Sequence, residues 1–399
     1  MQESQGDKTP ESSPGKVAVP MTVAPHFRLA KVMKMVFLAE ALAPGQSGPG
    51  IVCDSVTSDY EMFYKYMAGF SGYVLGPAGI SVNSVCQFLA ILHKDETASI
   101  FVNQVPVALA IRAKRGLKAG ERVGYNALAD ITGIRFVGIQ FAHTDSIIYC
   151  FKVNWKFGLY FDLRPQASKN PSFDSREASL AIASQYRRLA FQEVYDALES
   201  DRCFASMIQD GWFPFIELLG GEFEELVIFY QQSLDVAQKS LALSRTFDVE
   251  RLKHITERWW GHPLYDEKRA ILEAGTQAFT QATPHGDICC IKTLLPEIEG
   301  ILRLLLYADK GEDTRKQERW FAHLEEKARS KAHNAESLLI PGHFVHYLEN
   351  VIFPSFNLAS GTLSLSRHTA AHGLASPDLY TRVRALQVIL VLDQLRFCL

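Results

Sequence analysis

The sequence predicts an α+β protein in which an antiparallel sheet comes first and helices fill the remainder of the chain. Short runs of β-branched and aromatic residues, separated by Asp, Asn and Gly, occupy residues 97–163. Such runs are typical of antiparallel strands. From residue 174 onward, apolar residues recur at three- and four-residue intervals, which is typical of amphipathic helices. The chain has 399 residues, enough for two or three globular domains.

The first segments differ in composition from the predicted sheet. Residues 1–25 are rich in Ser, Gly, Pro and charged side chains, and we expect them to form a disordered tail. They contain no apolar core followed by a small-residue cleavage site, so they do not resemble a signal peptide. Residues 28–43 predict a short helix that ends at Pro44-Gly45. Residues 59–69 have Tyr, Phe and Met at near-helical spacing.

We assign residues 26–165 to one α+β domain of unknown role, with at least four strands in an antiparallel meander. The expected strands cover residues 99–102, 105–112, 134–141, 146–153 and 158–163. The densest basic cluster of the chain lies between two of them and consists of Arg112, Lys114, Arg115, Lys118 and Arg122. We expect a hairpin loop there; the alternative is a loop that binds RNA or a nucleotide through its phosphates.

Residues 166–173 form a polar linker, after which the chain is predicted to be helical. Asp174 or Ser175 provides the first helix cap, and residues 174–265 form a helical connector. Residues 266–399 form a C-terminal helical bundle. Its expected helices cover residues 265–283, 287–309, 313–335, 341–353 and a closing helix that begins at 376–377. The stretch at residues 313–335 is the most polar and is expected to face solvent.

Composition excludes some classes of protein. The formal net charge is -3 and the isoelectric point about 6.5, so contact with nucleic acid must be local rather than a bulk electrostatic attraction. The seven cysteines form no C-x-x-C pair, and most lie in apolar runs, which indicates buried reduced thiols. No apolar run reaches the ~20 residues that span a bilayer. We therefore expect a cytoplasmic protein with no membrane partner.

A short segment near the end of the chain carries the strongest chemical signal. Arg367 and His372 stand five residues apart, the polar His368 directly follows the arginine, and Gly373 is a typical residue for a helix C-terminus. Arginine grips phosphate oxygens at two points, and histidine moves protons near neutral pH. Chance alone gives ~2 such spacings in a chain of this composition, so the spacing needs its context. That context is the position of the segment, near the end of a helical block and before a closing helix.

In that context, the stretch Arg367-His368-Thr369-Ala370-Ala371-His372 resembles the HEPN superfamily. Its four- or five-helix domains carry Arg, then Asn, Asp or His, three further residues and His near their last helices. The resemblance covers about residues 266–399. It implies an RNA endonuclease that needs neither metal nor cofactor, acts as a homodimer through the C-terminal helical domain, and serves in defence or stress response.

The same resemblance implies a role for each residue. Arg367 would hold the phosphate, His372 from each of two subunits would supply acid and base, and His368 would orient the site or contact RNA. DNA, without a 2′-hydroxyl, would resist cleavage. Several HEPN domains also place an acidic residue on an early helix near the motif, and Glu299 is the candidate here. An ordinary ion pair one helical turn away, with Arg303, is the alternative for Glu299.

Other interpretations stay open. Arg367 can be a surface or interface ion-pair residue, and His372 can interact with a helix dipole. The chain can be a non-catalytic HEPN-like module that dimerises while its N-terminal domain binds a ligand or a protein regulator, or its helices can form an unrelated bundle. We expect no metal, because Thr369 stands where a zinc protease motif requires Glu.

Overall fold

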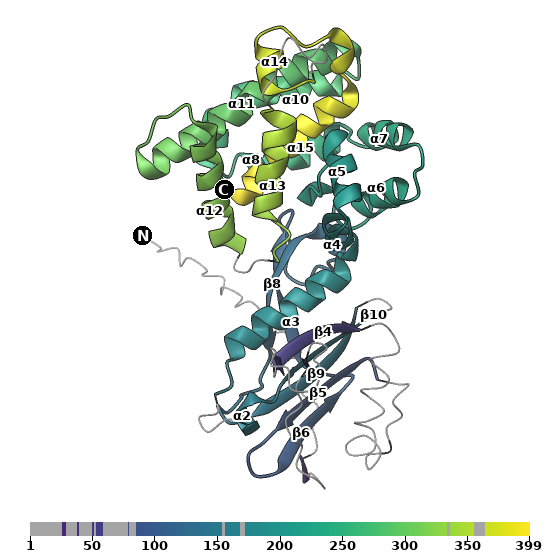
Figure 1. The fold of residues 1–399 in the computed structure, drawn as a ribbon, viewed down its shortest axis with the longest axis vertical. Coiled ribbons are helices and arrows are strands. Elements are labelled where there is room, and N and C mark those ends of the chain that lie inside the picture. The colour runs from purple at the N-terminus through teal and green to yellow at the C-terminus, as the bar shows by residue number, and fades with distance from the viewer. Residues whose placement is uncertain are drawn as a thin grey trace, which may run out of the picture.

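The computed structural model describes residues 85–153, 156–167, 172–332, 336–354 and 364–399, together with Gly79 and four short strands before residue 59. Figure 1 shows two parts, a sheet at the bottom and a body of helices above it, with α3 (Ser175–Ala190) and the hairpin strand β8 (Leu128–Phe136) between them. The predicted α+β fold, with its antiparallel sheet before a helical region, is confirmed.

The sheet contains six described strands in the order β1-β6-β5-β9-β10-β4, and every neighbouring pair is antiparallel. The strands are β1 (His26–Arg28), β4 (Cys53–Ser58), β5 (Gln87–Leu92), β6 (Thr97–Val102), β9 (Ser146–Val153) and β10 (Lys156–Asp162). The sheet is not a simple meander. Between β6 and β9 the chain leaves to form a separate hairpin of β7 (Val107–Ala113) with β8, then returns beside β5.

Two sequence expectations about this part are wrong. The strand β5 was missed, because an almost uninterrupted apolar run lacks the alternation that marks a half-buried strand. Strand β2 (Leu38–Ala39) lies inside residues 28–43, where we expected a helix, and it pairs with β3 (Gly50–Ile51). Cross-strand pairing of this kind depends on a distant partner, which local periodicity does not reveal. The predictions for residues 1–25 and 59–69 lie outside the described residues.

Both faces of the sheet carry buried side chains. Side chains such as Tyr149 and Phe151 face α3, where Phe151 stacks on Tyr186 with ring centroids 3.9 Å apart. Their strand neighbours Ile148 and Cys150 belong to a second cluster on the opposite face. The cap predicted for α3 is confirmed, since the side chain of Asp174 accepts hydrogen bonds from two backbone amides of its first turn.

The helices after α3 follow the predicted order with several changed boundaries. They are α4 (Gln192–Glu199), α5 (Asp201–Gln209), α6 (Glu222–Gln231), α7 (Val236–Arg245), α8 (Val249–Trp259), α9 (Pro263–Glu267), α10 (Arg269–Thr280), α11 (Pro284–Lys310), α12 (Gln317–Ala332), α13 (Pro341–Tyr347), α14 (Arg367–Ala371) and α15 (Arg382–Cys398). The linker region begins with the short helix α2 (Arg164–Ala167).

A turn at Ser233, whose φ is +54°, separates α6 from α7. Two expectations for the C-terminal helices are wrong. The closing helix begins after its cap Thr381, while Pro377 opens a short 3-10 turn instead. Helix α12 is not simply solvent-facing, since it buries Trp320 and Phe321.

Helix α15 is the centre of the helical part. It contacts α7, α8, α10, α11 and α12, and nearly every residue from Ala385 to Leu395 is buried. Two of its buried polar side chains tie it to the chain before α6: Gln394 accepts a hydrogen bond from the amide of Ile216 at 3.0 Å, and Gln387 donates to the carbonyl of Asp210 at 2.9 Å. One buried cluster continues from the sheet face under α3 to this helix, so the sheet and the helices share a core.

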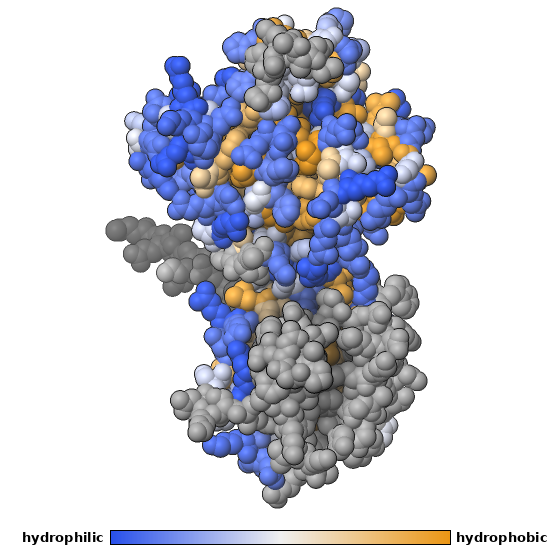
Figure 2. Space-filling model, in the orientation of Figure 1, coloured by the Kyte–Doolittle hydropathy of each residue, from blue (hydrophilic) through white to orange (hydrophobic). Residues whose placement is uncertain are grey.

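The surface of the helical part mixes polar and apolar side chains. Figure 2 shows hydrophobic residues over α6 and α7, where Ile228, Leu234 and Leu241 are exposed. None of the helices in the described ranges is both long and apolar enough to cross a membrane.

Candidate functional site

The segment that carries Arg367 and His372 forms a single short helix, α14. Ser366 caps it: its Oγ accepts a hydrogen bond from the Thr369 amide at 3.2 Å, and Thr369 Oγ1 accepts one from the Ser366 amide at 2.9 Å. Both side chains are buried. The helix ends at His372, and Gly373 follows in the left-handed conformation with φ +69°, as its sequence position predicts.

Helix α11 holds α14 at two points that lie two helical turns apart. Lys292 donates from Nζ to the carbonyl of Ala370 at 2.9 Å. Arg367 Nε lies 2.6 Å from Oε2 of Glu299. The structure therefore brings together Arg367 and Glu299, two of the residues selected from the sequence. Glu299 also lies 3.9 Å from Arg303, so it contacts both of the arginines considered for it.

The two histidines of the segment have different surroundings. Nε2 of Gln317 lies 3.0 Å from Nε2 of His368, and an amide N–H donor at this place pairs with the neutral tautomer whose Nε2 accepts. Partial burial and then the neighbouring charge of Arg367 lower the pKa of His368, which favours the same neutral form. His372 is exposed at the C-terminal end of α14. In one chain, therefore, His372 is the histidine of this segment that is placed to exchange protons with a bound substrate.

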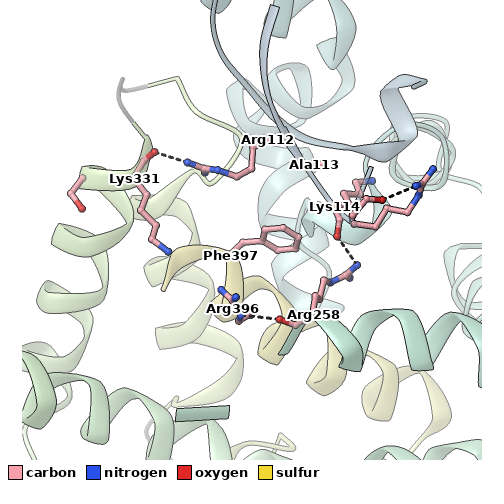
Figure 3. Close-up of a pocket in the computed structure, with 10 residues that line it drawn as sticks. Arg112, Ala113, Lys114, Arg258, Lys331, Arg396 and Phe397 are labelled. Atoms are coloured by element: carbon pink, nitrogen blue, oxygen red, sulfur yellow. Dashed lines mark hydrogen bonds between the residues drawn. The ribbon is translucent and has the colours of Figure 1, made fainter. Parts of the chain in front are cut away.

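A second candidate site lies where the hairpin meets the helices. It is a pocket of about 510 Å³ between the end of β7 and the C-terminal ends of α8, α12 and α15 (Figure 3). Ten described residues line it, of which six are basic and none is acidic: Arg112, Ala113, Lys114, Arg115, Gly116, Arg258, Ser330, Lys331, Arg396 and Phe397. We call it the basic pocket.

Three of the six cations in the basic pocket have compensating partners. Arg258 pairs with Asp393 at 2.6 Å and with Glu217 at 2.5 Å, and Arg115 pairs with Glu121. Lys114 donates from Nζ to the carbonyl of Leu219 at 2.7 Å, and burial lowers its pKa to about 8.

The other three cations, Arg112, Lys331 and Arg396, form no ion pair with any acidic side chain of the described ranges. Arg112 donates from Nη2 to the carbonyl of Lys331 at 2.7 Å, and Arg396 from Nε to the carbonyl of Arg258 at 3.0 Å. These carbonyls belong to the last turns of α12 and α8. Helix C-terminal ends carry partial negative charge, which helps to hold cations there.

The structure does not place the predicted basic residues beside the Arg/His segment. Lys292 contacts both α14 and the ring of Tyr380, just before α15, so α14 lies near the start of that helix. Arg112, Lys114 and Arg115 line the basic pocket. Arg396, near the end of α15, lines the same pocket. The helix rise puts these ends about 21 Å apart, too far for one phosphate group to contact both.

Sequence reasoning missed Arg258, Lys331 and Arg396, which complete the basic pocket. They lie on three separate helices, and each occupies the last turn of its helix. A basic residue in the last turn of a helix is common, because it interacts favourably with the helix dipole. The sequence therefore did not indicate that these three residues lie around one pocket. Among the residues that the structure describes, no group of three or more His, Cys, Asp or Glu could hold a metal ion.

Comparisons with protein-family models, with curated proteins and with solved structures found no match. The resemblance to the HEPN superfamily, which the segment around Arg367 suggests, therefore stays a prediction.

Proposed function

We propose that this chain is a metal-independent RNA endonuclease of the HEPN type that acts as a homodimer through its C-terminal helical domain. One observation carries the proposal: Arg367 forms an ion pair with Glu299, without an aligned hydrogen bond from Nε, on a short helix whose far end presents the exposed His372. A role in defence or stress response follows by analogy with the superfamily.

The chemistry uses the substrate's own nucleophile. The 2′-hydroxyl oxygen attacks the adjacent phosphorus, the bond from phosphorus to the 5′ oxygen breaks, and a 2′,3′-cyclic phosphate and a 5′-hydroxyl result. A base removes the 2′ proton while an acid protonates the leaving 5′ oxygen. One His372 cannot perform both tasks in the same step, so the second comes from His372 of the other subunit.

The contact with Glu299 suits a phosphate-holding role for Arg367. Glu299 approaches Nε, so the two Nη groups of the guanidinium remain directed elsewhere and can donate to phosphate oxygens. Fixing the side chain in advance lowers the entropy lost when the substrate binds. His368, kept neutral by Gln317 and by its lowered pKa, orients the segment rather than acting as an acid.

The direct test is RNA cleavage in excess EDTA by the full-length protein and by His372→Ala. We expect the variant to lose about 100-fold or more of the rate, the usual contribution of a general acid or base. His285→Ala is the matched control, because His285 is an exposed histidine of the same helical part. Cleavage should stop when the nucleotide 5′ of the scissile bond is 2′-deoxy. Equal rates for wild type and His372→Ala, or a requirement for metal, would refute the mechanism.

The composite site has a separate test. Adding His372→Ala protein to wild type and allowing subunits to exchange creates mixed dimers with a single His372. If two copies act together, cleavage should fall more steeply than dilution of wild type explains. A loss in simple proportion to dilution would show that each chain acts alone.

The second candidate function is a non-catalytic HEPN-like module that dimerises and senses a ligand. The observation that favours it is the basic pocket, which joins the hairpin of the N-terminal part to three helices far from α14. Under this alternative the wild-type protein dimerises but leaves RNA intact under every condition above.

A further inference from the structure

We propose that the basic pocket binds a nucleoside polyphosphate, with its phosphates on Arg112, Lys331 and Arg396 and its base on the ring of Phe397. This site is separate from α14, and the inference does not depend on the proposed nuclease activity.

The first support is uncompensated positive charge. Arg112, Lys331 and Arg396 converge from a strand and two helices, and none of them has an ion-pair partner within the described part of the chain. Burial and the neighbouring charges of Arg396 and Arg112 lower the pKa of Lys331, which reports their mutual repulsion. A bound anion would relieve that repulsion and so stabilise the folded protein.

The second support is the direction of the available donors. Arg112 and Arg396 each give one N–H group to a helix-end carbonyl, which fixes the side chain in place. The remaining Nη1 of Arg112 is buried and has no hydrogen-bond partner. A buried donor without a partner destabilises the folded protein, so an acceptor that reached this atom would bind favourably. Two fixed guanidinium groups beside an ammonium group match the oxygens of adjacent phosphates.

The third support is an aromatic ring among the cations. Figure 3 shows Phe397 at the centre of the basic pocket, with Arg258, Arg396 and Lys331 around it. The guanidinium of Arg258 lies 5.4 Å from the ring centroid. An aromatic face beside phosphate-binding cations is the arrangement on which nucleobases stack. Inorganic phosphate alone would leave this ring unused.

The size and walls of the basic pocket favour a mononucleotide over an RNA strand. About 510 Å³ lies within the range of small-molecule sites. Its lining residues come from the end of β7 and the loop after it and from the last turns of α8, α12 and α15, so the cations are gathered around one point rather than spread along a groove that an RNA backbone would follow.

The test is isothermal titration of the full-length protein with ATP, GTP, pyrophosphate, adenosine and a ten-nucleotide single-stranded RNA. We expect one triphosphate to bind more tightly than pyrophosphate, and adenosine to bind weakly or not at all. Lys331→Gln should weaken triphosphate binding by about tenfold or more, because it removes a charge-assisted contact. Lys316→Gln, at an exposed lysine outside the basic pocket, is the matched control and should bind as wild type does.

Phe397→Leu separates the base contact from the phosphate contacts. It should weaken triphosphate binding and leave pyrophosphate binding unchanged. Thermal unfolding without ligand verifies that each variant is folded, and Arg396→Gln replaces any variant that is not. The proposal is overturned if no triphosphate binds, if Lys331→Gln binds as tightly as wild type, if pyrophosphate binds as tightly as ATP and GTP, or if RNA alone binds.

Discussion

Arg367, near the start of α15, and three cations near its end differ in their partners. Near its start, on α14, Arg367 meets the carboxylate of Glu299 at 2.6 Å. Near its end, Arg112, Lys331 and Arg396 surround the basic pocket without an acidic partner in the described ranges. Glu299 supplies a negative charge beside Arg367. No acidic side chain lines the basic pocket, so in our proposal the anion there comes from a bound ligand. The predictions below test this difference.

The largest expected effect is on Arg258, the arginine of the basic pocket that pairs with two carboxylates. Asp393 accepts hydrogen bonds from Arg258 and from Trp259, and its side chain is almost completely buried. Asp393→Ala leaves that guanidinium with Glu217 as its one carboxylate partner and leaves the buried indole N–H of Trp259 without its acceptor, and we expect a loss of about 3–5 kcal/mol in unfolding free energy. Urea denaturation measures it. Asp313→Ala, which removes an exposed partner of Arg303, should cost no more than about 1 kcal/mol. Similar losses for both variants would contradict the comparison.

The next effect is a pH dependence from Lys114. Its folded-state pKa is about 8, below the unfolded value near 10.4, so between these pH values the unfolded chain binds more protons. Its contribution opposes folding below pH 8 and is relieved as pH rises toward 10. We expect wild-type unfolding free energy, measured relative to Lys114→Met, to rise by up to about 3 kcal/mol over that range. Lys118→Met, at an exposed lysine of the same loop, is the control. If the difference in unfolding free energy between wild type and Lys114→Met does not change with pH, Lys114 stays charged in the folded protein.

A smaller effect is expected at α14, where the ion pair is partly exposed. A double-mutant cycle of Glu299→Gln with Arg367→Gln should give a coupling free energy of about 1 kcal/mol. The cycle of Glu299→Gln with Arg303→Gln should give less, because that pair is 3.9 Å apart. A larger coupling free energy for Glu299 with Arg303 than with Arg367 would mean that Glu299 mainly stabilises α11 and does not position Arg367.

The smallest expected effect is the change in unfolding free energy when Lys331, a cation without an acidic partner in the described ranges, is replaced. Without ligand, Lys331→Gln removes a like charge from between Arg112 and Arg396. We expect its unfolding free energy to equal that of wild type within about 0.5 kcal/mol or to exceed it slightly at low salt. A loss above about 1 kcal/mol in urea would reveal a structural partner of Lys331 and weaken the case for an anion site.

Much of the fold follows from local patterns in the sequence. The cap at Asp174, the turn at Gly373 and most of the strands near residues 97–162 depend on neighbours in sequence, and the structure confirms them. The strand expected at 134–141 is the exception, because β8 ends at Phe136. Strand β5 and the pairing of β2 with β3 depend on strands far away along the chain. For the same reason, the excursion of the β7–β8 hairpin out of the sheet was not predicted.

The candidate sites divide in the same way. The sequence selected Arg367, His368 and His372 because they stand within one short segment, and Glu299 through the HEPN resemblance. Arg112, Lys114 and Arg115 were found as a cluster in a loop. Their partners in the basic pocket could not be found, because Arg258 and Arg396 are 138 residues apart along the chain.

The sequence by itself determined that a sheet precedes the helices, where most of the helices lie, and which residues can handle phosphate, because these follow from side-chain chemistry and local spacing. Only the tertiary structure decided that Glu299 meets Arg367 and that three helix ends converge on one hairpin. Those contacts arise from packing around α15, whose buried length joins the two sites and also keeps them apart.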